Sequence, residues 1–219
     1  MADPPRKPAL RPPAPRGAGR TRATPADALR LARKRWLAGE RLDIGMLAKE
    51  LGVARATLFR WVGSRDLLLA EVLWSMCEPT LRRAAEATPG EGVPRIAQVC
   101  ETAVRQMMAF EPLRRFIAED ADLALRLLTS KASPVQARTI AAVRELLEFE
   151  RRRGSWKPPL SIDTLAYLMV RLGESFLYAN VLSGQQVDVG DTGVAVQLLL
   201  SGRVEPGPLS AASAPARSR

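Results

Sequence analysis

Apolar residues recur along most of the chain at spacings of three and four, the period of amphipathic helices, rather than at the spacing of two typical of strands. Glycine and proline interrupt this pattern at intervals that suit helices. The sequence therefore predicts an all-α fold without a sheet. Helices are expected over about 25–38, 43–51, 54–61, from Ser64 to before Pro89, from Pro94 to about Phe110, and over about 113–130, 134–153, 162–183 and 191–200, with an interruption at Glu111–Pro112.

Both ends of the chain have a composition unlike the middle. Residues 1–23 contain six prolines and almost no large apolar side chains, and residues 204–219 are rich in Pro, Ser and Ala. Such segments cannot bury enough apolar surface to order themselves, so we predict two disordered tails. The N-terminal tail is either a solvated linker or a basic arm that tracks phosphates or enters a minor groove.

Positive charge is concentrated near the N-terminus. The 219 residues carry a formal net charge of +10, and the first 63 positions hold 14 basic against five acidic residues. The rest of the chain is nearly balanced. Clustered cations bind polyanions because they release counterions from nucleic acid, so a nucleic-acid partner is expected at this end.

The residues that most enzymes use are scarce. The chain contains no histidine, which excludes Ser-His-Asp and Cys-His nucleophile pairs, a histidine general base and a His-ligated metal. Its two cysteines, Cys77 and Cys100, suggest neither a disulfide framework nor a redox pair. We expect no catalytic residue, no metal and no cofactor, and a location in the reducing cytoplasm, associated with the nucleoid.

Neither a membrane span nor an export signal is expected. The most apolar stretch, Leu165 to Leu182, has Arg171 and Glu174 in its middle, where charges are costly in hydrocarbon. This stretch is therefore interpreted as a buried protein helix. The N-terminus has no apolar segment of the kind found in signal peptides.

Residues 43–61 have the pattern of two short helices joined by a tight turn. Asp43 can cap the first helix, and Gly52 can end it. In the second helix Leu58 is expected to point inward. The apolar residues of the first helix follow the spacing i, i+3, i+4, i+7 and are Ile44, Leu47, Ala48 and Leu51. This is the arrangement of a helix-turn-helix, whose second helix enters the major groove of DNA.

The segment DIGMLAKELGVARATLFRWVGSRDLLL, residues 43–69, resembles the N-terminal domain of the TetR family of bacterial repressors. The resemblance extends over roughly 25–75. The matching residues are Ile44, Leu47, Ala48, Gly52, Val53, Thr57, Leu58, Phe59, Trp61, Ser64, Arg65, Leu68 and Leu69. It implies a DNA-binding domain over 24–75 and a helical effector-binding and dimerisation domain over 76–203. The arrangement of the last predicted helices, with the segment WKPPLS before Ile162, resembles the QsdR-like branch of this family.

The sequence departs from the family pattern at three positions. Ala54 stands where a Ser or Thr usually caps the recognition helix, which removes a cap worth about 1 kcal/mol. Phe59 and Trp61 replace tyrosines that give hydroxyls to phosphates, although the Trp61 indole N–H can still donate.

The resemblance places the DNA contacts on and around the second helix. The candidate residues are Lys49, Arg55, Ala56, Thr57, Phe59, Arg60, Trp61, Ser64 and Arg65. Arg60 could read guanine or clamp a phosphate. Ser64 and Arg65 could bind a phosphate at the start of the next helix. Lys49 fits a solvated face better than a DNA contact, and Trp36 is expected to pack between helices rather than stack on bases.

The second domain contains candidates for a dimer interface and a ligand cavity. The helix over 162–183 has two apolar faces, one with Leu165, Leu168, Leu172, Ser175, Ala179 and Leu182, the other with Val170, Gly173, Leu177 and Val181. One face could pack on a second copy, or both could be buried in one protomer. The ligand candidates are Met107, Phe110, Trp156, Tyr167, Arg171 and Glu174, with core packing as the alternative for the Met and Phe positions. Tyr167, Arg171 and Glu174 could orient an effector or pair with one another.

These observations predict a homodimeric transcriptional regulator. It would bind a palindromic operator in double-stranded DNA, act as a repressor, and be released by a small apolar effector of unknown identity. One alternative is an architectural DNA-binding protein without an effector, in which the basic tail dominates binding. The other, an enzyme using Glu119, Asp120 and Asp122, lacks a phosphate loop or metal-ligand spacing.

Overall fold

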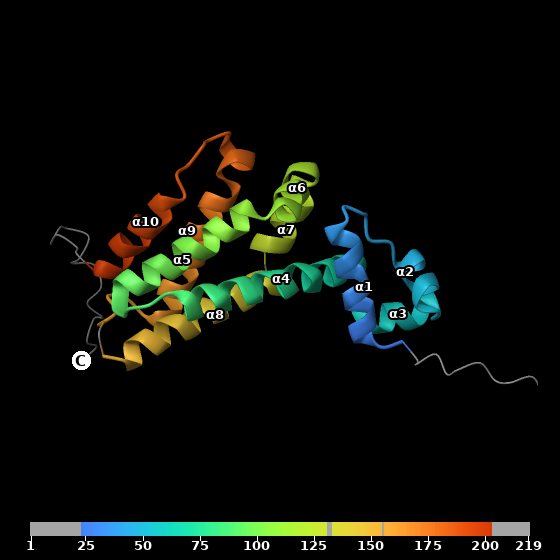
Figure 1. The fold of residues 1–219 in the computed structure, drawn as a ribbon, viewed down its shortest axis with the longest axis horizontal. Coiled ribbons are helices and arrows are strands. Elements are labelled where there is room, and N and C mark those ends of the chain that lie inside the picture. The colour runs from blue at the N-terminus through green and yellow to red at the C-terminus, as the bar shows by residue number, and fades with distance from the viewer. Residues whose placement is uncertain (1–22, 131–132, 155, 203–219) are drawn as a thin grey trace, which may run out of the picture.

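The computed structural model describes residues 23–130, 133–154 and 156–202, and within them it contains ten helices and no strand (Figure 1). The predicted all-α fold is confirmed. The helices are α1 (Pro25–Leu37), α2 (Ile44–Leu51), α3 (Arg55–Val62), α4 (Arg65–Ala87), α5 (Gly92–Ala109), α6 (Glu111–Glu119), α7 (Ala121–Thr129), α8 (Pro134–Arg152), α9 (Ile162–Ser183) and α10 (Gly190–Ser201). The tails predicted at 1–23 and 204–219 lie outside the described residues, apart from Ala23.

Helices α1 to α3 form a small unit at one end of the molecule (Figure 1). Thr24 begins α1 with a capping box, because its hydroxyl accepts from the Asp27 N–H while the Asp27 carboxylate accepts from the Thr24 N–H. Asp43 caps α2 through a 2.7 Å bond from the Met46 N–H. Gly52 ends α2 in the left-handed conformation, at φ 67°, where a side chain would be strained.

The long helix α4 connects this unit to the rest of the chain. The Ser64 hydroxyl caps it by accepting from the Leu67 N–H at 3.1 Å. In Figure 1, α4 runs from α1 at one end to α5 and α8 at the other, and it packs against all three. The boundary predicted at residue 75 thus falls inside a continuous helix, which belongs to both parts.

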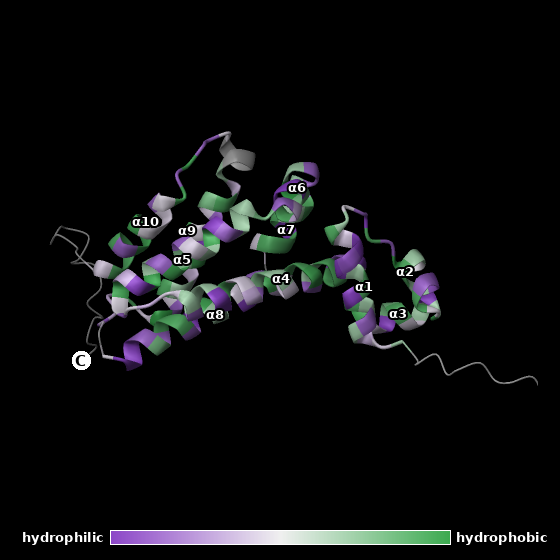
Figure 2. Cartoon of the chain, viewed as in Figure 1, coloured by the Kyte–Doolittle hydropathy of each residue, from purple (hydrophilic) through white to green (hydrophobic). Residues whose placement is uncertain are grey.

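The second unit is built on α5, α8, α9 and α10, which pack on one another beyond α4. Their shared core includes Ile96, Leu147, Leu165, Val196 and Leu200, each at most 1% exposed. Figure 2 shows hydrophobic and hydrophilic segments alternating along these helices, as amphipathic helices require. Helices α6 and α7 lie between this unit and α1, and their residues Leu113, Ile117 and Leu123 belong to a core cluster that also contains residues of α1 to α4.

The single helix predicted over 113–130 is wrong in two respects. It is divided into α6 and α7 at Asp120, whose φ and ψ of −145° and 65° are not helical. The Asp120 carboxylate then caps α7 by accepting from the Leu123 N–H at 3.3 Å. Glu111 and Pro112 also begin α6 rather than separating two helices, since proline is tolerated in a first turn, where its missing N–H is not needed.

A buried ion pair fixes the far end of the second unit. Glu150 of α8 is 0% exposed, and its carboxylate accepts from Arg95 Nη1 at 2.6 Å and from the Gly92 N–H at 2.7 Å. Arg95 Nε also donates to the Thr88 carbonyl at 3.0 Å. The side chain of Arg95, at the start of α5, therefore connects the end of α4 with the end of α8.

Candidate nucleic-acid interface and ligand cavity

The predicted helix-turn-helix is formed by α2 and α3. The turn between them is held by bonds from the Gly52 N–H to the Lys49 carbonyl at 3.2 Å and from the Val53 N–H to the Ala48 carbonyl at 3.0 Å. Leu58 of α3 is 0% exposed and packs into the same core as Leu47 and Ala48 of α2. The inner face of each helix is thus fixed, so the opposite face of α3 is free.

The free face of α3 carries most of the residues expected to contact DNA. Arg55, Ala56, Phe59 and Arg60 are exposed, and Thr57 is half-buried. The Arg55 guanidinium lies over the Phe59 ring, 5.4 Å from its centroid, as a cation–π contact that steadies both side chains. Ala54 stands at the N-cap without a side-chain bond, as its methyl group requires.

The remaining candidates have mixed environments. Trp61 is half-buried and packs against the core of the unit, and Lys49 is exposed on α2. Ser64 uses its hydroxyl as the cap of α4. Arg65 donates from Nε to the Leu42 carbonyl at 2.8 Å and is half-buried, so it braces the segment before α2.

Sequence reasoning missed two features of this surface. Met46 of α2 is 67% exposed. The sequence did contain a signal for this exposure, because Met46 is not one of the apolar residues of α2 that follow the i, i+3, i+4 spacing. Arg35 of α1 binds Glu40 and Glu50, each at 2.7 Å, and therefore ties α1 to α2. Hydrogen bonds to Glu50 and Glu40 raise the pKa of Arg35. No pattern in the sequence links these charges, because they meet only in the fold.

An apolar cavity of about 90 Å³ lies inside the second unit, and we call it the interior cavity. Its walls come from α4, α5, α6, α7, α8, α9 and α10 and are mainly aliphatic, including Leu81, Val104, Val143 and Val170. Four lining residues have a hydroxyl or carboxyl group: Thr139, Glu174, Tyr178 and Thr192. An apolar space with a few polar groups is the usual form of a small-molecule site.

The polar groups of the interior cavity are incompletely satisfied. Thr192 Oγ1 is buried without a hydrogen-bond partner in the described part of the chain. Glu174 Oε2 lies 2.7 Å from Arg171 Nη1 as an ion pair, but without hydrogen-bond geometry. Burial raises the pKa of Glu174 against the lowering effect of Arg171 and Gln136, and burial also raises the pKa of Tyr178. These atoms could bind polar groups of a ligand.

The structure brings together only some of the predicted ligand residues. Met107 and Glu174 line the interior cavity, and Phe110 lies beside Trp36 at the boundary of the two units. Trp156 packs against the α10 end, where its indole N–H donates to the Leu200 carbonyl at 3.2 Å. Tyr167 and Arg171 are exposed, and Arg171 pairs with Glu174.

The two units meet through aromatic side chains. Trp36 of α1 is buried between helices, as predicted, with Phe110 and Phe116 around it. Arg115 of α6 donates to the Leu37 carbonyl at 3.4 Å. Because α6 contacts α1 directly, a movement in the second unit can reach the helix-turn-helix.

The described residues contain no group of three or more His, Cys, Asp or Glu side chains placed to hold a metal ion. Nor does any helix among them have the length and hydropathy needed to span a membrane. What the described structure does contain is a helix-turn-helix with an exposed second helix on an all-helical body, the form of a DNA-binding protein.

Comparisons with known proteins agree with this class. Residues 91–201 match the family model of the tetracyclin repressor-like C-terminal domain. The solved structure of the R. erythropolis transcriptional repressor QsdR, from the TetR family, aligns with a TM-score of 0.75 and 29% identity over 84% of this chain and 97% of that one. The curated proteins include no match. The chain therefore belongs to the TetR family of DNA-binding transcriptional regulators, and not to a class of enzymes.

Proposed function

We propose that this regulator is a repressor that acts in the cytoplasm as a homodimer on a palindromic operator and is released by a small apolar effector. The observation that carries the proposal is the orientation of α3. Leu58 anchors its inner face completely, while Arg55, Ala56 and Arg60 project into solvent. A helix held in this way can enter a major groove without rearrangement.

Each exposed residue has a role that follows from its chemistry. Arg60 presents a planar guanidinium that can bind both acceptors of a guanine. Arg55 and Thr57 contact bases or phosphates nearby. The first turn of α4, which begins after Ser64, offers backbone N–H groups to a phosphate, and the exposed Lys49 adds a cation.

The dimer surface is proposed on α9 and α10. Leu165 and Val170, from the two faces predicted for α9, are both buried within one protomer, whereas Ser175 is exposed. The predicted residues Val181 and Leu182 lie outside the described side chains. On α10, Val194 and Leu198 are 57% and 72% exposed and one turn apart. An exposed apolar pair of this kind is suited to burial against a second copy, and twofold symmetry matches a palindromic site.

The effector is proposed to enter the interior cavity. At about 90 Å³ this cavity is smaller than usual ligand pockets of about 300–1,000 Å³, so a ligand must enlarge it. Glu174 and Thr192 would orient polar groups of a mainly apolar molecule. Enlargement moves α4 and α6, which contact α1, and so changes the separation of the two recognition helices. A ligand releases DNA only if it binds the released conformation better.

The experiment is an unbiased selection of bound DNA fragments, followed by titration of the selected site. The fragments should share a palindrome, and Arg60→Ala should weaken binding by roughly 1–3 kcal/mol if Arg60 reads a base. Arg144→Ala is the matched control, because Arg144 is an exposed arginine on α8 paired with Asp163. Unchanged affinity in Arg60→Ala would show that Arg60 is not part of the DNA interface. Selected fragments without a palindrome would contradict binding as a dimer.

A further inference from the structure

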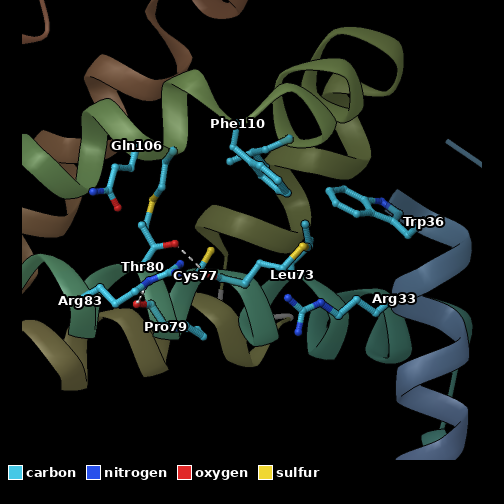
Figure 3. A pocket seen from close by; sticks show the side chains of 12 residues that line it. Arg33, Trp36, Leu73, Cys77, Pro79, Thr80, Arg83, Gln106 and Phe110 are labelled. Carbon is cyan, nitrogen blue, oxygen red and sulfur yellow. Dashed lines mark hydrogen bonds between the residues drawn. The ribbon is translucent and has the colours of Figure 1, made fainter. Parts of the chain in front are cut away.

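A second cavity lies where the two units meet, and we call it the junction cavity (Figure 3). Its volume is about 240 Å³, and its walls come from α1, α4, α5 and the start of α6. It is therefore distinct from the interior cavity, which has no wall on α1. The two share Cys77, Met107 and Leu113 as a common wall.

The body of the junction cavity is apolar. Leu73 and Met76 of α4 face Met107 of α5 and Phe110, which lies between α5 and α6, and Trp36 closes the end toward α1. The aromatic rings of Trp36 and Phe110 lie 6.5 Å apart, which leaves flat apolar surfaces beside the space. Flexible methionine side chains adapt to ligands of different shape. An aliphatic or aromatic body would be well accommodated.

The charge of the cavity has one sign. Among the described residues that line it, the charged ones are Arg33 and Arg83, with no carboxylate. Figure 3 shows them toward opposite ends of the cavity, Arg33 on α1 and Arg83 on α4. Arg33 has no ion pair or hydrogen bond within the described ranges, whereas Arg83 donates to its own helix, from Nε to the Pro79 carbonyl at 3.0 Å.

Arg82, the neighbour of Arg83, differs from the two arginines of the cavity because its charge is paired. Arg82 pairs with Glu78 at 3.4 Å and with Glu86 at 3.3 Å, so its charge is compensated on the outer side of α4. Among the residues that the structure describes, no carboxylate pairs with Arg33 or Arg83 in this way, and Arg83 donates only to the Pro79 carbonyl. An uncompensated guanidinium beside an apolar slot attracts a negative group that an apolar chain carries with it.

We propose that the junction cavity binds an amphipathic organic anion, a carboxylate on an apolar body of about eight carbons. The carboxylate pairs with the guanidinium of Arg33, and the apolar body lies along Leu73, Met76 and Phe110. Arg83 adds positive potential from the far end. The cavity is below the size of drug-sized pockets, which favours a short chain.

Binding there has a regulatory consequence that rests on the proposed function. Arg33 and Trp36 belong to α1, while the other walls belong to α4, α5 and α6. A bound anion therefore draws α1 toward one position relative to α4, and so selects one placement of the recognition helix. This input is separate from an effector in the interior cavity.

The test is calorimetric titration of the full chain with three probes of equal length: octanoate, 1-octanol and octylammonium. Octanoate should bind about tenfold or more tightly than 1-octanol, and octylammonium should bind most weakly. Equal affinity for octanoate and 1-octanol, or tighter binding of octylammonium, would overturn the proposal. All three probes have an eight-carbon chain, so differences in their affinity report the charge of the head group and not the burial of apolar surface.

Variants place the site. Arg33→Ala should weaken octanoate binding about tenfold and Arg33→Lys much less, since the charge remains. Arg83→Ala should have a smaller effect. Two controls should leave the affinity unchanged: Arg82→Ala, which removes a paired charge on the same helix, and Gly173→Ala, whose added Cβ enters the interior cavity at an ordinary 3.5 Å from Val104. Unchanged affinity in Arg33→Ala, or a loss confined to Gly173→Ala, contradicts the assignment.

The result does not depend on operator binding. Octanoate binding is measured without DNA, so it can succeed even if no palindrome is selected. Conversely, selected operator DNA with no octanoate binding would sustain the proposed function and reject this site. Adding octanoate to the DNA complex then shows whether the site changes operator affinity.

Discussion

The indole of Trp36 meets the ring of Phe116 edge-on, with centroids 6.0 Å apart and ring planes at 72°. Trp36 belongs to α1 and Phe116 to α6, so this contact joins the helix-turn-helix unit to the second unit without passing through α4. Aromatic side chains are rigid and closely packed, so they transmit displacement rather than absorb it.

Phe116→Leu should weaken this junction while keeping an apolar side chain in place. The expected loss is roughly 0.5–1.5 kcal/mol of unfolding free energy, the usual value of an aromatic pair. Denaturant unfolding followed by tryptophan fluorescence would measure it. Phe149→Leu is the control, since Phe149 is 47% exposed on α8. Equal losses in the two variants would show that the Trp36 contact has no special weight.

Removal of residues 1–22 tests the basic tail against the helix-turn-helix. A regulator that reads DNA through α3 should keep its preference for the selected site, but with lower affinity and a shallower dependence on salt concentration, because cations that meet phosphates have been lost. Fluorescence anisotropy at several salt concentrations measures both. Loss of nearly all affinity and all preference would instead favour the architectural alternative.

Glu150→Gln should destabilise the chain strongly. The variant leaves the guanidinium of Arg95 in a nearly closed site without its carboxylate, and breaking such a pair costs about 3–5 kcal/mol. Denaturant titration gives the value. Glu148→Gln on the same helix removes an exposed pair with Arg151 and should change stability by less than about 1 kcal/mol. Similar effects of both substitutions would contradict the buried-pair account.

The two thiols should react slowly at neutral pH. Burial raises the pKa of Cys77 to about 11 and that of Cys100 to about 12, and only the thiolate is nucleophilic. At pH 8 alkylation should be on the order of 100-fold slower for Cys77 and 1,000-fold slower for Cys100 than for an unperturbed cysteine, and it should rise about tenfold per pH unit until the pKa is approached. Mass spectrometry of the native chain after iodoacetamide treatment measures this rate, and rapid alkylation at pH 8 would refute it.

Leu198→Glu should prevent dimerisation. The substitution places a charge on the most exposed leucine of α10, and burying it against a second copy would require desolvation without a partner. Analytical ultracentrifugation should show a shift from dimer to monomer. Leu67→Glu is the control, because Leu67 is also exposed but lies on α4 near the helix-turn-helix. A dimer that survives Leu198→Glu would place the interface elsewhere.

The helix-turn-helix could be predicted almost completely, because its signals are local. Asp43, Gly52 and the apolar spacing of α2 each act within a few residues. The break at Asp120 escaped prediction because the flanking residues favour helix on both sides, although Asp120 itself is a suitable N-cap residue and caps α7. An apolar periodicity cannot report such a bend.

Ligand residues were harder to predict because they depend on contacts between distant segments. Met107 and Glu174 line the interior cavity, but Trp156 and Tyr167, whose aromatic rings also suit a ligand site, lie elsewhere. In the sequence, Arg33 could not be distinguished from the other basic residues of the same predicted helix. Only the position of α4 and α5 beside α1 distinguishes it from Arg30, which pairs with Asp27.

The partition between the two cavities is made of Cys77, Met107 and Leu113, which line a chamber on each side. Space gained by one chamber through a turn of the Met107 thioether is taken from the other. If both proposed ligands bind, they would oppose or assist each other through the position of Met107, so that two chemical signals would act on one operator.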